Sequence, residues 1–161
     1  MTDVKQIVLY PNEVLTQATK PVGVITDEVK AIAEELKKMM TGRGVGLSAN
    51  QLGYDKSIFC MFNPRGVTVC VDPEITSAGT ELDLKQEGCL SLPTVHTKVS
   101  RPREINVKYT NLEGVVVEDT LTGMQARIFQ HELDHLKGKL IIDYLPTIIR
   151  KFTLEKYHKR K

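Results

Sequence analysis

The chain has 161 residues, 41% of them hydrophobic and 26% charged, which are ordinary proportions for a globular protein with a buried core. Its 22 basic and 20 acidic residues leave a formal net charge of +2, too small to favour a nucleic-acid-binding protein. No run approaches the roughly 20 apolar residues of a membrane span, and the start, MTDVKQIVLYPNE, lacks the pattern of a signal peptide. We therefore expect one domain over residues 1–161, located in the cytoplasm without a membrane partner.

Residues 27–41 predict an amphipathic helix, because their apolar side chains fall on one face and lysines and glutamates cover the other. Thr26 is placed to cap the start of this helix and Gly42 to end it. Short β-rich runs follow a glycine-rich loop, and residues 111–114, NLEG, are typical of a hairpin turn. These runs are residues 57–62, 67–72, 94–100, 104–110 and 115–121.

The last part of the chain predicts a helix over residues 123–137, a short strand over 140–145 and a final helix from about Pro146. Strands grouped between helices, without βαβ alternation, favour the α+β class. We therefore expect short antiparallel β-sheets packed around the central helix 123–137, with a further helix at the C-terminus.

The predicted central helix contains His131-Glu132-x-x-His135, a pattern typical of hydrolytic metal sites. Histidines four residues apart lie on one helix face, so both can bind the same cation. Glu132 projects about 100° further round, where its carboxylate can move a proton without binding the metal. Met124 and Ile128 are expected to form an apolar wall beside the metal. The alternative is a surface helix that merely contains two histidines.

A catalytic site of this kind needs a third protein ligand and one open position. The candidates are Cys89 in EGCLS and Glu155 in the basic tail RKFTLEKYHKRK. We favour Cys89, because a thiolate is a strong ligand and Gly88 beside it lets the backbone approach a bound group. Glu155 has lysines nearby that offer it surface ion pairs instead. The basic tail itself is either a solvated helix end or a contact for an anionic partner such as RNA.

The other cysteines, Cys60 and Cys70, lie within β-rich runs, where a buried structural cysteine is the usual case. Three cysteines do not indicate a disulfide framework, and a reducing compartment is the simplest location.

The glycine-rich loop at residues 44–51, GVGLSANQ, fits the dinucleotide pattern G-x-G-x-x-A only superficially. That pattern must follow a strand and open a helix, whereas this loop follows a helix and leads towards strands. We therefore expect no dinucleotide, and assign the glycines to close contact with an extended substrate. Gln51 either donates a hydrogen bond to an oxyanion or only braces the loop.

Three segments in this order, GVGLSANQ, EGCLS and QHELDHL, together resemble the motifs of the peptide deformylase family. The likeness extends over nearly the whole chain, from VLYPNEVL near the start to LIIDYL after the central helix. It implies an α+β fold and a metal-dependent hydrolase that removes the N-formyl group from the N-terminal methionine of newly synthesised polypeptides and releases formate.

The resemblance also implies a role for individual residues. Cys89, His131 and His135 would bind the metal, and Glu132 would be the general acid/base. The oxyanion would be held by Gln51 and the backbone N–H of Leu90, and Glu87 and Arg101 match a pair that supports the site. The residues implied to bind substrate are Val45, Gly46, Gly88, Leu90 and Ile128.

The family typically uses Fe2+, with Zn2+, Ni2+ or Co2+ expected as replacements. The partners implied are N-formylmethionyl nascent peptides and, through the basic tail, a transient contact with the ribosome. We expect a monomer from a bacterium or a phage. Two other hypotheses stay open, a metallopeptidase that uses Glu155 and an RNA- or ribosome-binding protein with a purely structural metal.

Three positions depart from the family pattern. Ser48 stands where alanine is usual, and we expect no loss of chemistry from this change. His96 stands where many bacterial members have arginine, so contacts beyond the methionine are expected to differ. Arg127 occupies a position that is often apolar, which leaves the rim of the pocket and its selectivity open.

Overall fold

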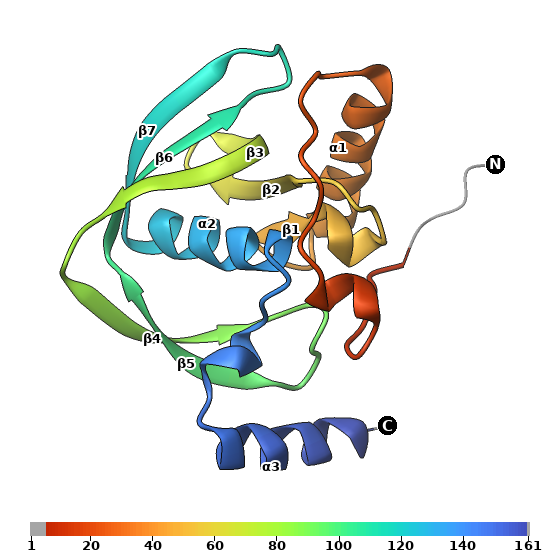
Figure 1. Ribbon diagram of the computed structural model, residues 1–161, viewed down its shortest axis with the longest axis vertical. Coiled ribbons are helices and arrows are strands. Elements are labelled where there is room, and N and C mark those ends of the chain that lie inside the picture. The colour runs from red at the N-terminus through yellow and green to blue at the C-terminus, as the bar shows by residue number, and fades with distance from the viewer. Residues whose placement is uncertain (1–5, 161) are drawn as a thin grey trace.

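In the computed structural model, which describes residues 6–160, two antiparallel sheets and two α-helices are arranged around a third, central α-helix (Figure 1). The larger sheet has the strand order β1-β2-β3-β6-β7 and the smaller one pairs β4 with β5. This arrangement confirms the predicted α+β class. The strands are β1 (Gly46–Ser48), β2 (Ile58–Asn63), β3 (Gly66–Ala78), β4 (Leu82–Gly88), β5 (His96–Pro102), β6 (Glu104–Thr110) and β7 (Val116–Thr122).

Helix α1 (Asp27–Met40) forms where the amphipathic pattern predicts it. The Thr26 hydroxyl accepts a hydrogen bond from the backbone N–H of Val29 at 3.3 Å, which satisfies one of the free donors at the helix start. Gly42, with φ at +79°, follows the end of the helix in the left-handed conformation that glycine tolerates.

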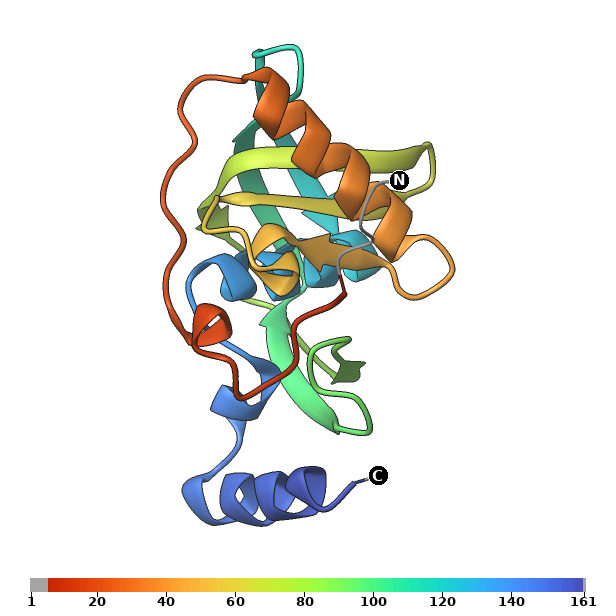
Figure 2. The same ribbon diagram turned by 90° about the vertical axis from the view of Figure 1, so that its right-hand side faces the viewer.

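Strand β2 lies between α1 and the central helix α2 (Gly123–Leu136), with α1 crossing its outer side (Figure 2). Ile58 and Cys60 pack in the core beside α1, whereas Phe59 packs on the opposite face against α2. The rings of Phe59 and Phe129 meet edge to face with centroids 5.0 Å apart. Burial on both faces explains why SIFCMF is apolar at successive positions rather than at alternate ones.

Strand β3 bends, so its first half pairs with β2 and its second half pairs with β6. Register shifts interrupt its pairing with β6, and Asp72 adopts a φ of +49°. The Asp72 carboxylate accepts hydrogen bonds from the backbone N–H groups of Val22 and Gly23, at 2.8 and 2.9 Å. The predicted strand 67–72 therefore ends too early, because the sequence Asp-Pro marks a bend inside the strand rather than its end.

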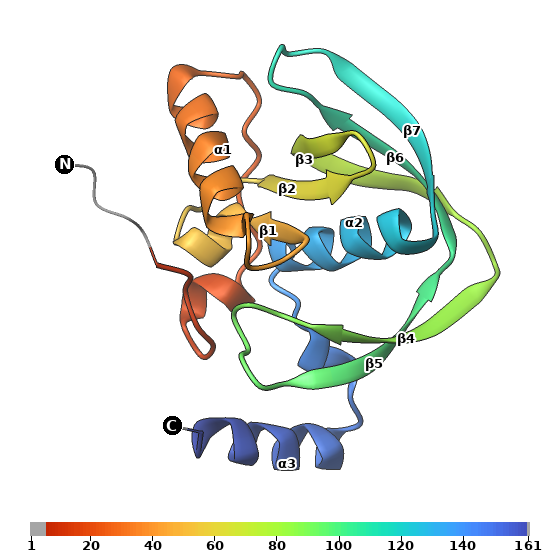
Figure 3. The same ribbon diagram turned by 180° about the vertical axis from the view of Figure 1, so that it is seen from behind.

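The smaller sheet lies on the other side of α2 from the β1–β2–β3 part of the larger sheet (Figure 3). Its strand β4 is absent from the sequence prediction, and β5 begins two residues later than the predicted run 94–100. The loop between the two strands contains Cys89 and lies next to α2. The smaller sheet therefore places the loop that contains Cys89 next to the central helix, although the two are far apart in sequence.

The chain after α2 differs from its prediction. Residues 140–145 were expected as a strand, but Ile141–Tyr144 form a 3-10 helix. The Asp143 carboxylate accepts a hydrogen bond from the backbone N–H of Leu140 at 2.8 Å, and this local bond stabilises the turn over an extended conformation. The expected C-terminal helix is present as α3 (Thr147–His158). Two further 3-10 helices are Glu13–Thr16 and Ala49–Leu52. Within residues 6–160, no helix is both long and apolar enough to cross a membrane.

The connection after α2 makes a specific prediction about Gly138. Both Gly138 and Gly42 have left-handed φ angles, +78° and +79°, which cost an L-residue about 1–2 kcal/mol. Of these two positions, only Gly138 would bring an added Cβ close to other atoms. This Cβ would lie 2.7 Å from the carbonyl carbon of Thr16. We expect Gly138→Ala to lower the free energy of unfolding more than Gly42→Ala, measured by chemical denaturation. Equal losses would show that the contact with Thr16 has no energetic weight.

Candidate active site

Three predicted ligands meet between α2 and the end of β4. Helix α2 places the Nε2 atoms of His131 and His135 3.3 Å apart. Cys89 directly follows β4, and its Sγ lies 3.3 Å from His135 Nε2. All three donor atoms lie within 4.8 Å of one another. The structure thus brings together two helix residues and a cysteine that is 46 positions from His135.

The spacing of these donors fits one transition-metal ion. Bonds of about 2.0–2.1 Å to imidazole nitrogen and about 2.3 Å to thiolate sulfur, at tetrahedral angles, place donor atoms roughly 3.3–3.6 Å apart. The two separations of 3.3 Å agree with this range. A catalytic ion takes three protein ligands and keeps one position for water or substrate, and the cluster offers three.

Glu155, the alternative third ligand, is not brought to this place. Its side chain is exposed on α3, and it does not join the ligand cluster found within residues 6–160. Cys60 and Cys70 are buried in the core, as predicted, and lie outside that cluster.

A buried carboxylate orients His131. Glu87 Oε1 lies 2.9 Å from His131 Nδ1, which leaves the Nε2 atom of the ring directed at the other donors. Arg101 holds the same carboxylate with two hydrogen bonds, of 2.6 and 2.9 Å. Burial alone would raise the pKa of Glu87, but its hydrogen bonds with Arg101 and His131 outweigh burial and lower the pKa to about 2. Glu87 is therefore ionised throughout the neutral range.

Arg101 has two further partners that no sequence pattern predicts. It donates to the Asp134 carboxylate at 2.9 Å and to the Tyr144 hydroxyl at 3.3 Å. The Tyr144 hydroxyl also donates to Asp134, at 2.6 Å. Asp134 is on α2 and Tyr144 in the following 3-10 helix, so only the folded chain places them beside an arginine of β5.

The two histidines differ in their electrostatic surroundings. Burial lowers the pKa of His135 well below its usual range, which keeps its imidazole in the neutral form that binds metals. Burial also favours neutral His131, but hydrogen bonds with Cys89 and Glu87 outweigh it and raise the pKa of His131 to about 10. Metal binding at this site must therefore displace a proton.

Glu132 is buried beside the donors, with 4% of its surface exposed. Its Oε1 atom has no hydrogen-bond partner within residues 6–160. Burial raises the pKa of Glu132 to about 7, so this carboxyl can accept and release a proton near neutral pH. A Cβ on Gly46 would lie 2.7 Å from Glu132 Oε2, so a side chain at this position would displace the carboxylate.

The side-chain amide of Gln51 is fixed at both ends. Its Oε1 accepts a hydrogen bond from the backbone N–H of Ser48 at 3.0 Å, and its Nε2 donates to the Ser91 hydroxyl at 3.0 Å. An amide nitrogen has two N–H groups, and this one also lies 3.8 Å from Cys89 Sγ. One donor of Gln51 is thus directed towards the ligand cluster. Ser91 was not predicted, although it lies within the motif EGCLS.

Ser48 and Asn50 connect the Gln51 loop to α2. The Ser48 hydroxyl lies 2.7 Å from Asn50 Oδ1 and 3.0 Å from Gln51 Oε1, so it can donate to either acceptor. Asn50 Nδ2 donates to the backbone carbonyl of His135 at 2.6 Å. Ser48, Asn50 and Gln51 are all buried. The serine therefore has a definite polar role where the family was expected to have alanine.

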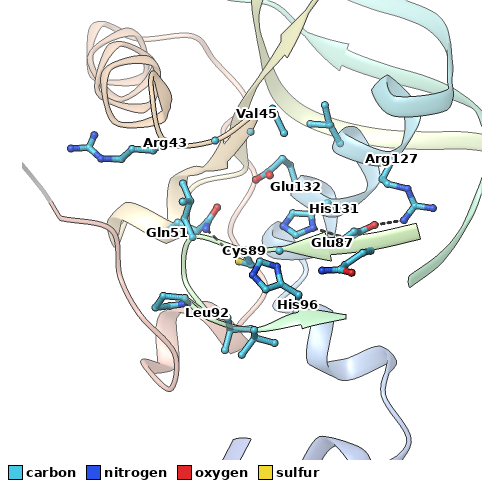
Figure 4. A pocket seen from close by; sticks show the side chains of 18 of the residues that line it. Arg43, Val45, Gln51, Glu87, Cys89, Leu92, His96, Arg127, His131 and Glu132 are labelled. Atoms are coloured by element: carbon cyan, nitrogen blue, oxygen red, sulfur yellow. Dashed lines mark hydrogen bonds and ion pairs between the residues drawn. The ribbon is translucent and has the colours of Figure 1, made fainter. Parts of the chain in front are cut away.

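A pocket of about 460 Å³ opens onto the cluster, within the usual size range of small-ligand sites (Figure 4). Cys89, His131, Glu132 and Gln51 converge on it, and the exposed side chain of Met124 also lines it. The residues predicted to bind substrate all line it, namely Val45, Gly46, Gly88, Leu90 and Ile128.

The remaining two departures from the family pattern have different positions. His96 is exposed and lines the pocket. It lies close to Gly88, where an added Cβ would be 3.1 Å from the Nδ1 atom of His96. Arg127 belongs to the pocket wall, but its guanidinium turns away from the pocket towards Glu87 (Figure 4). Its charge is therefore not presented to a bound ligand.

Comparison with known proteins gives consistent matches over nearly the whole chain. The family model for polypeptide deformylase matches residues 4–151. The chain is 40% identical to the peptide deformylase of Aquifex aeolicus, covering 97% of this chain and 96% of that protein. The crystal structure of peptide deformylase from Thermotoga maritima matches with a TM-score of 0.86 and 37% identity, over 90% of this chain and 99% of that one. The structure of the Ehrlichia chaffeensis enzyme with actinonin has a TM-score of 0.92 at 29% identity, over 99% of this chain and 100% of that one.

The serine network leads to a prediction for Ser48→Ala. Asn50 Oδ1 would stay buried without its donor, so we expect the free energy of unfolding to fall by about 1–3 kcal/mol. Metal content should not change, because no ligand moves. The exposed Ser100→Ala serves as control and should stay within about 0.5 kcal/mol of wild type in chemical denaturation. Equal stability of the two variants would contradict the role of the Ser48 hydroxyl.

Proposed function

The chain belongs to the polypeptide deformylase family, and we propose that Cys89, His131 and His135 hold its metal ion while Glu132 moves the proton of the reaction. As a member of this family, it is a hydrolase that removes the N-formyl group from the N-terminal methionine of new polypeptides and releases formate. The observation that carries the proposed roles is the meeting of three donors, 3.3 Å apart in two pairs, beside a buried carboxylate with an unpaired oxygen.

One thiolate and two imidazoles suit several divalent ions. We propose Fe2+ as the native ion, with Zn2+, Ni2+ or Co2+ as replacements. When bound, the ion supplies Lewis acidity and makes a water-derived nucleophile available near neutral pH. The chain's own residues supply everything else that the reaction needs, which is a proton carrier, oxyanion donors and a pocket.

Glu132 is the proton carrier in this proposal. Its unpaired Oε1 accepts a proton from the water that attacks the formyl carbon, and the carbonyl oxygen becomes an oxyanion. As the C–N bond breaks, the same carboxyl gives its proton to the leaving nitrogen. The products are formate and a free α-amino group. A pKa of about 7 suits both transfers, because the group must be ionised in one step and protonated in the next.

Two donors are assigned to the oxyanion, the Gln51 amide and the backbone N–H of Leu90. Gln51 supports this role because its oxygen is held by Ser48 and one N–H by Ser91, so its orientation is fixed before substrate binds. Leu90 lines the pocket directly after the cysteine. Donors fixed in advance lose no orientational freedom when the oxyanion forms.

The pocket accounts for recognition of formylmethionine. Val45 and Gly46 from the glycine loop and Gly88 from the end of β4 bring backbone to its edges, where an extended peptide can lie. Ile128 and Met124 offer an apolar wall to a methionine side chain, which is flexible and unbranched.

The proposed setting is the cytoplasm, where newly made chains leave the ribosome. Helix α3 and the residue that caps its end carry the exposed cations Lys151, Lys156 and Lys159. They support a transient, salt-sensitive contact with ribosomal RNA.

The proton-carrier role is tested by formate release from formyl-Met-Ala-Ser, with the acetylated peptide as substrate control. We expect Glu132→Gln to retain the metal and to lower kcat about 100- to 10,000-fold, because the proton carrier is lost. Glu155→Gln, which changes an exposed glutamate of α3, should match wild type. Substantial turnover by Glu132→Gln would remove Glu132 from this role, and loss of metal from Glu155→Gln would overturn the choice of Cys89 over Glu155.

The ligand assignment is tested by metal content after purification without oxygen. Cys89→Ala should lose the metal, because the site keeps only two imidazoles. Cys70→Ala removes a buried thiol of β3 outside the ligand cluster and should keep it. Full occupancy in Cys89→Ala would exclude this cysteine as a ligand.

A further inference from the structure

Arg127 is a buried arginine on the pocket face of α2, with 7% of its surface exposed. Neighbouring positions on that face, Met124 and Ile128, are apolar and line the pocket. Burying a guanidinium costs free energy unless it is fully paired. Its position at the wall of an apolar pocket therefore needs a specific set of partners.

Those partners all belong to the β4–β5 hairpin. Arg127 Nη2 donates to the backbone carbonyl of Asp83 on β4 at 2.8 Å, and Nη1 donates to the carbonyl of Val99 on β5 at 3.0 Å. Nη1 also forms an ion pair with the carboxylate of Glu87, on β4. One side chain of α2 therefore binds both strands of the hairpin and the carboxylate that contacts His131 (Figure 4).

The carboxylate of Glu87 divides its two oxygens between these partners. Oε1 is next to His131 Nδ1 and one nitrogen of Arg101, and Oε2 receives Arg101 Nε and Arg127 Nη1. Removal of Arg127 leaves Oε2 with a single donor, so the carboxylate is held by Arg101 and His131 alone. It also removes the bonds from α2 to the backbone of both hairpin strands.

We propose that Arg127 is a positioning residue for the metal site, which fixes the Cys89 end of the hairpin against α2 and holds Glu87 in place behind His131. The inference rests on the proposed ligands Cys89, His131 and His135. Two ligands belong to α2 and the third to the chain that leaves β4, so a bond from α2 to both hairpin strands sets the distance between them. Arg127 thereby acts on the ligands through the scaffold and without touching substrate.

The chemistry of the side chain makes the proposal specific. A guanidinium has several donors in a fixed plane, and here they reach three acceptors on two strands. Lysine keeps the charge but has a single nitrogen, which cannot reproduce this planar arrangement. Methionine keeps the volume of the aliphatic stem and loses all donors.

The test compares Arg127→Met and Arg127→Lys with wild type and with Arg103→Met. Arg103 is a matched control, because it is a neighbouring arginine that pairs with Glu81 and Asp83 near the hairpin but is exposed. Each protein is loaded with Co2+, and two quantities are recorded, the thiolate-to-cobalt absorption and the rate of cobalt loss to excess chelator. Circular dichroism verifies that each variant is folded.

We expect Arg127→Met to release cobalt about 10–100-fold faster than wild type, the usual effect of losing a group that supports metal ligands. Its thiolate absorption should shift, because Cys89 is no longer held in place, and a merely structural loss of packing would not produce this shift. Arg127→Lys should fall between wild type and Arg127→Met in both quantities, and Arg103→Met should match wild type. If Arg127→Met does not fold, Arg127→Lys is judged by the same two readouts.

Wild-type release and absorption in Arg127→Met would overturn the proposal for Arg127, while leaving the ligand assignment intact. Equal effects in Arg127→Met and Arg103→Met would also overturn it, because any arginine near the hairpin would then serve. Cys89→Ala, loaded with Co2+ in parallel, distinguishes a failure of the ligand assignment from a failure of the proposal for Arg127 alone. If that variant keeps both cobalt and the absorption, the ligand assignment fails and the proposal for Arg127 fails with it.

Discussion

The proposed metal site depends on the distance between the β4–β5 hairpin and helix α2. Cys89 leaves the end of β4, and His131 and His135 are one turn apart on α2, so neither element holds the three donors alone. The donors come within 4.8 Å of one another only where the hairpin end meets the helix. Every contact that fixes this approach also fixes the coordination geometry. The structure places four buried or half-buried charges at this junction.

These charges form a balanced group in which each has its partner. Glu87 and Asp134 are acidic, and Arg101 and Arg127 are basic. The Arg101–Glu87 pair joins the two hairpin strands, and the other two ion pairs cross between the hairpin and α2. A buried carboxylate without such partners would be protonated or would destabilise the fold. The pKa of Glu87 is instead lowered to about 2, so its charge does not change with pH in the neutral range. The carboxylate that orients His131 therefore keeps its charge.

Glu132 contrasts with Glu87, although both line the pocket at the ligand cluster. It is buried without a compensating partner for Oε1 within residues 6–160, and burial raises its pKa to about 7. Two glutamates in one site thus have pKa values far apart, because one is surrounded by donors and the other is not. Glu87 supports the proposed ligand His131, whereas Glu132 exchanges protons.

The sequence predicted the elements that have a regular apolar spacing, and missed those whose apolar pattern is weak or misleading. The His131–His135 pair follows from helix geometry alone, and α1 follows from its apolar periodicity and its Thr26 cap. Strand β4 was missed because its apolar residues, Leu82 and Leu84, are 59% and 63% exposed and do not mark a buried face. Residues 140–145 were wrongly predicted as a strand because the stabilising bond from Asp143 is a local side-chain effect.

The role of Arg127 illustrates the same limit at the site itself. At this position of α2 a side chain can point into the pocket or away from it, and the sequence around Arg127 contains no signal for either direction. The choice depends on the backbone carbonyls of Asp83 and Val99, which belong to strands remote in sequence. The sequence context and the family resemblance both indicated Cys89 as a ligand, and the resemblance implied the Glu87–Arg101 pair. The contacts that Arg127 and Asp134 add to this pair became visible only in three dimensions.

X-ray absorption on the metal-loaded protein tests the central claim most directly, because it counts the neighbours of the ion without depending on turnover. Coordination that bridges the hairpin and α2 predicts one sulfur at about 2.3 Å and two imidazole nitrogens at about 2.0–2.1 Å, with a light atom at the remaining position. A first shell without sulfur, or with a carboxylate from the chain in place of the thiolate, would contradict an ion held between the two elements.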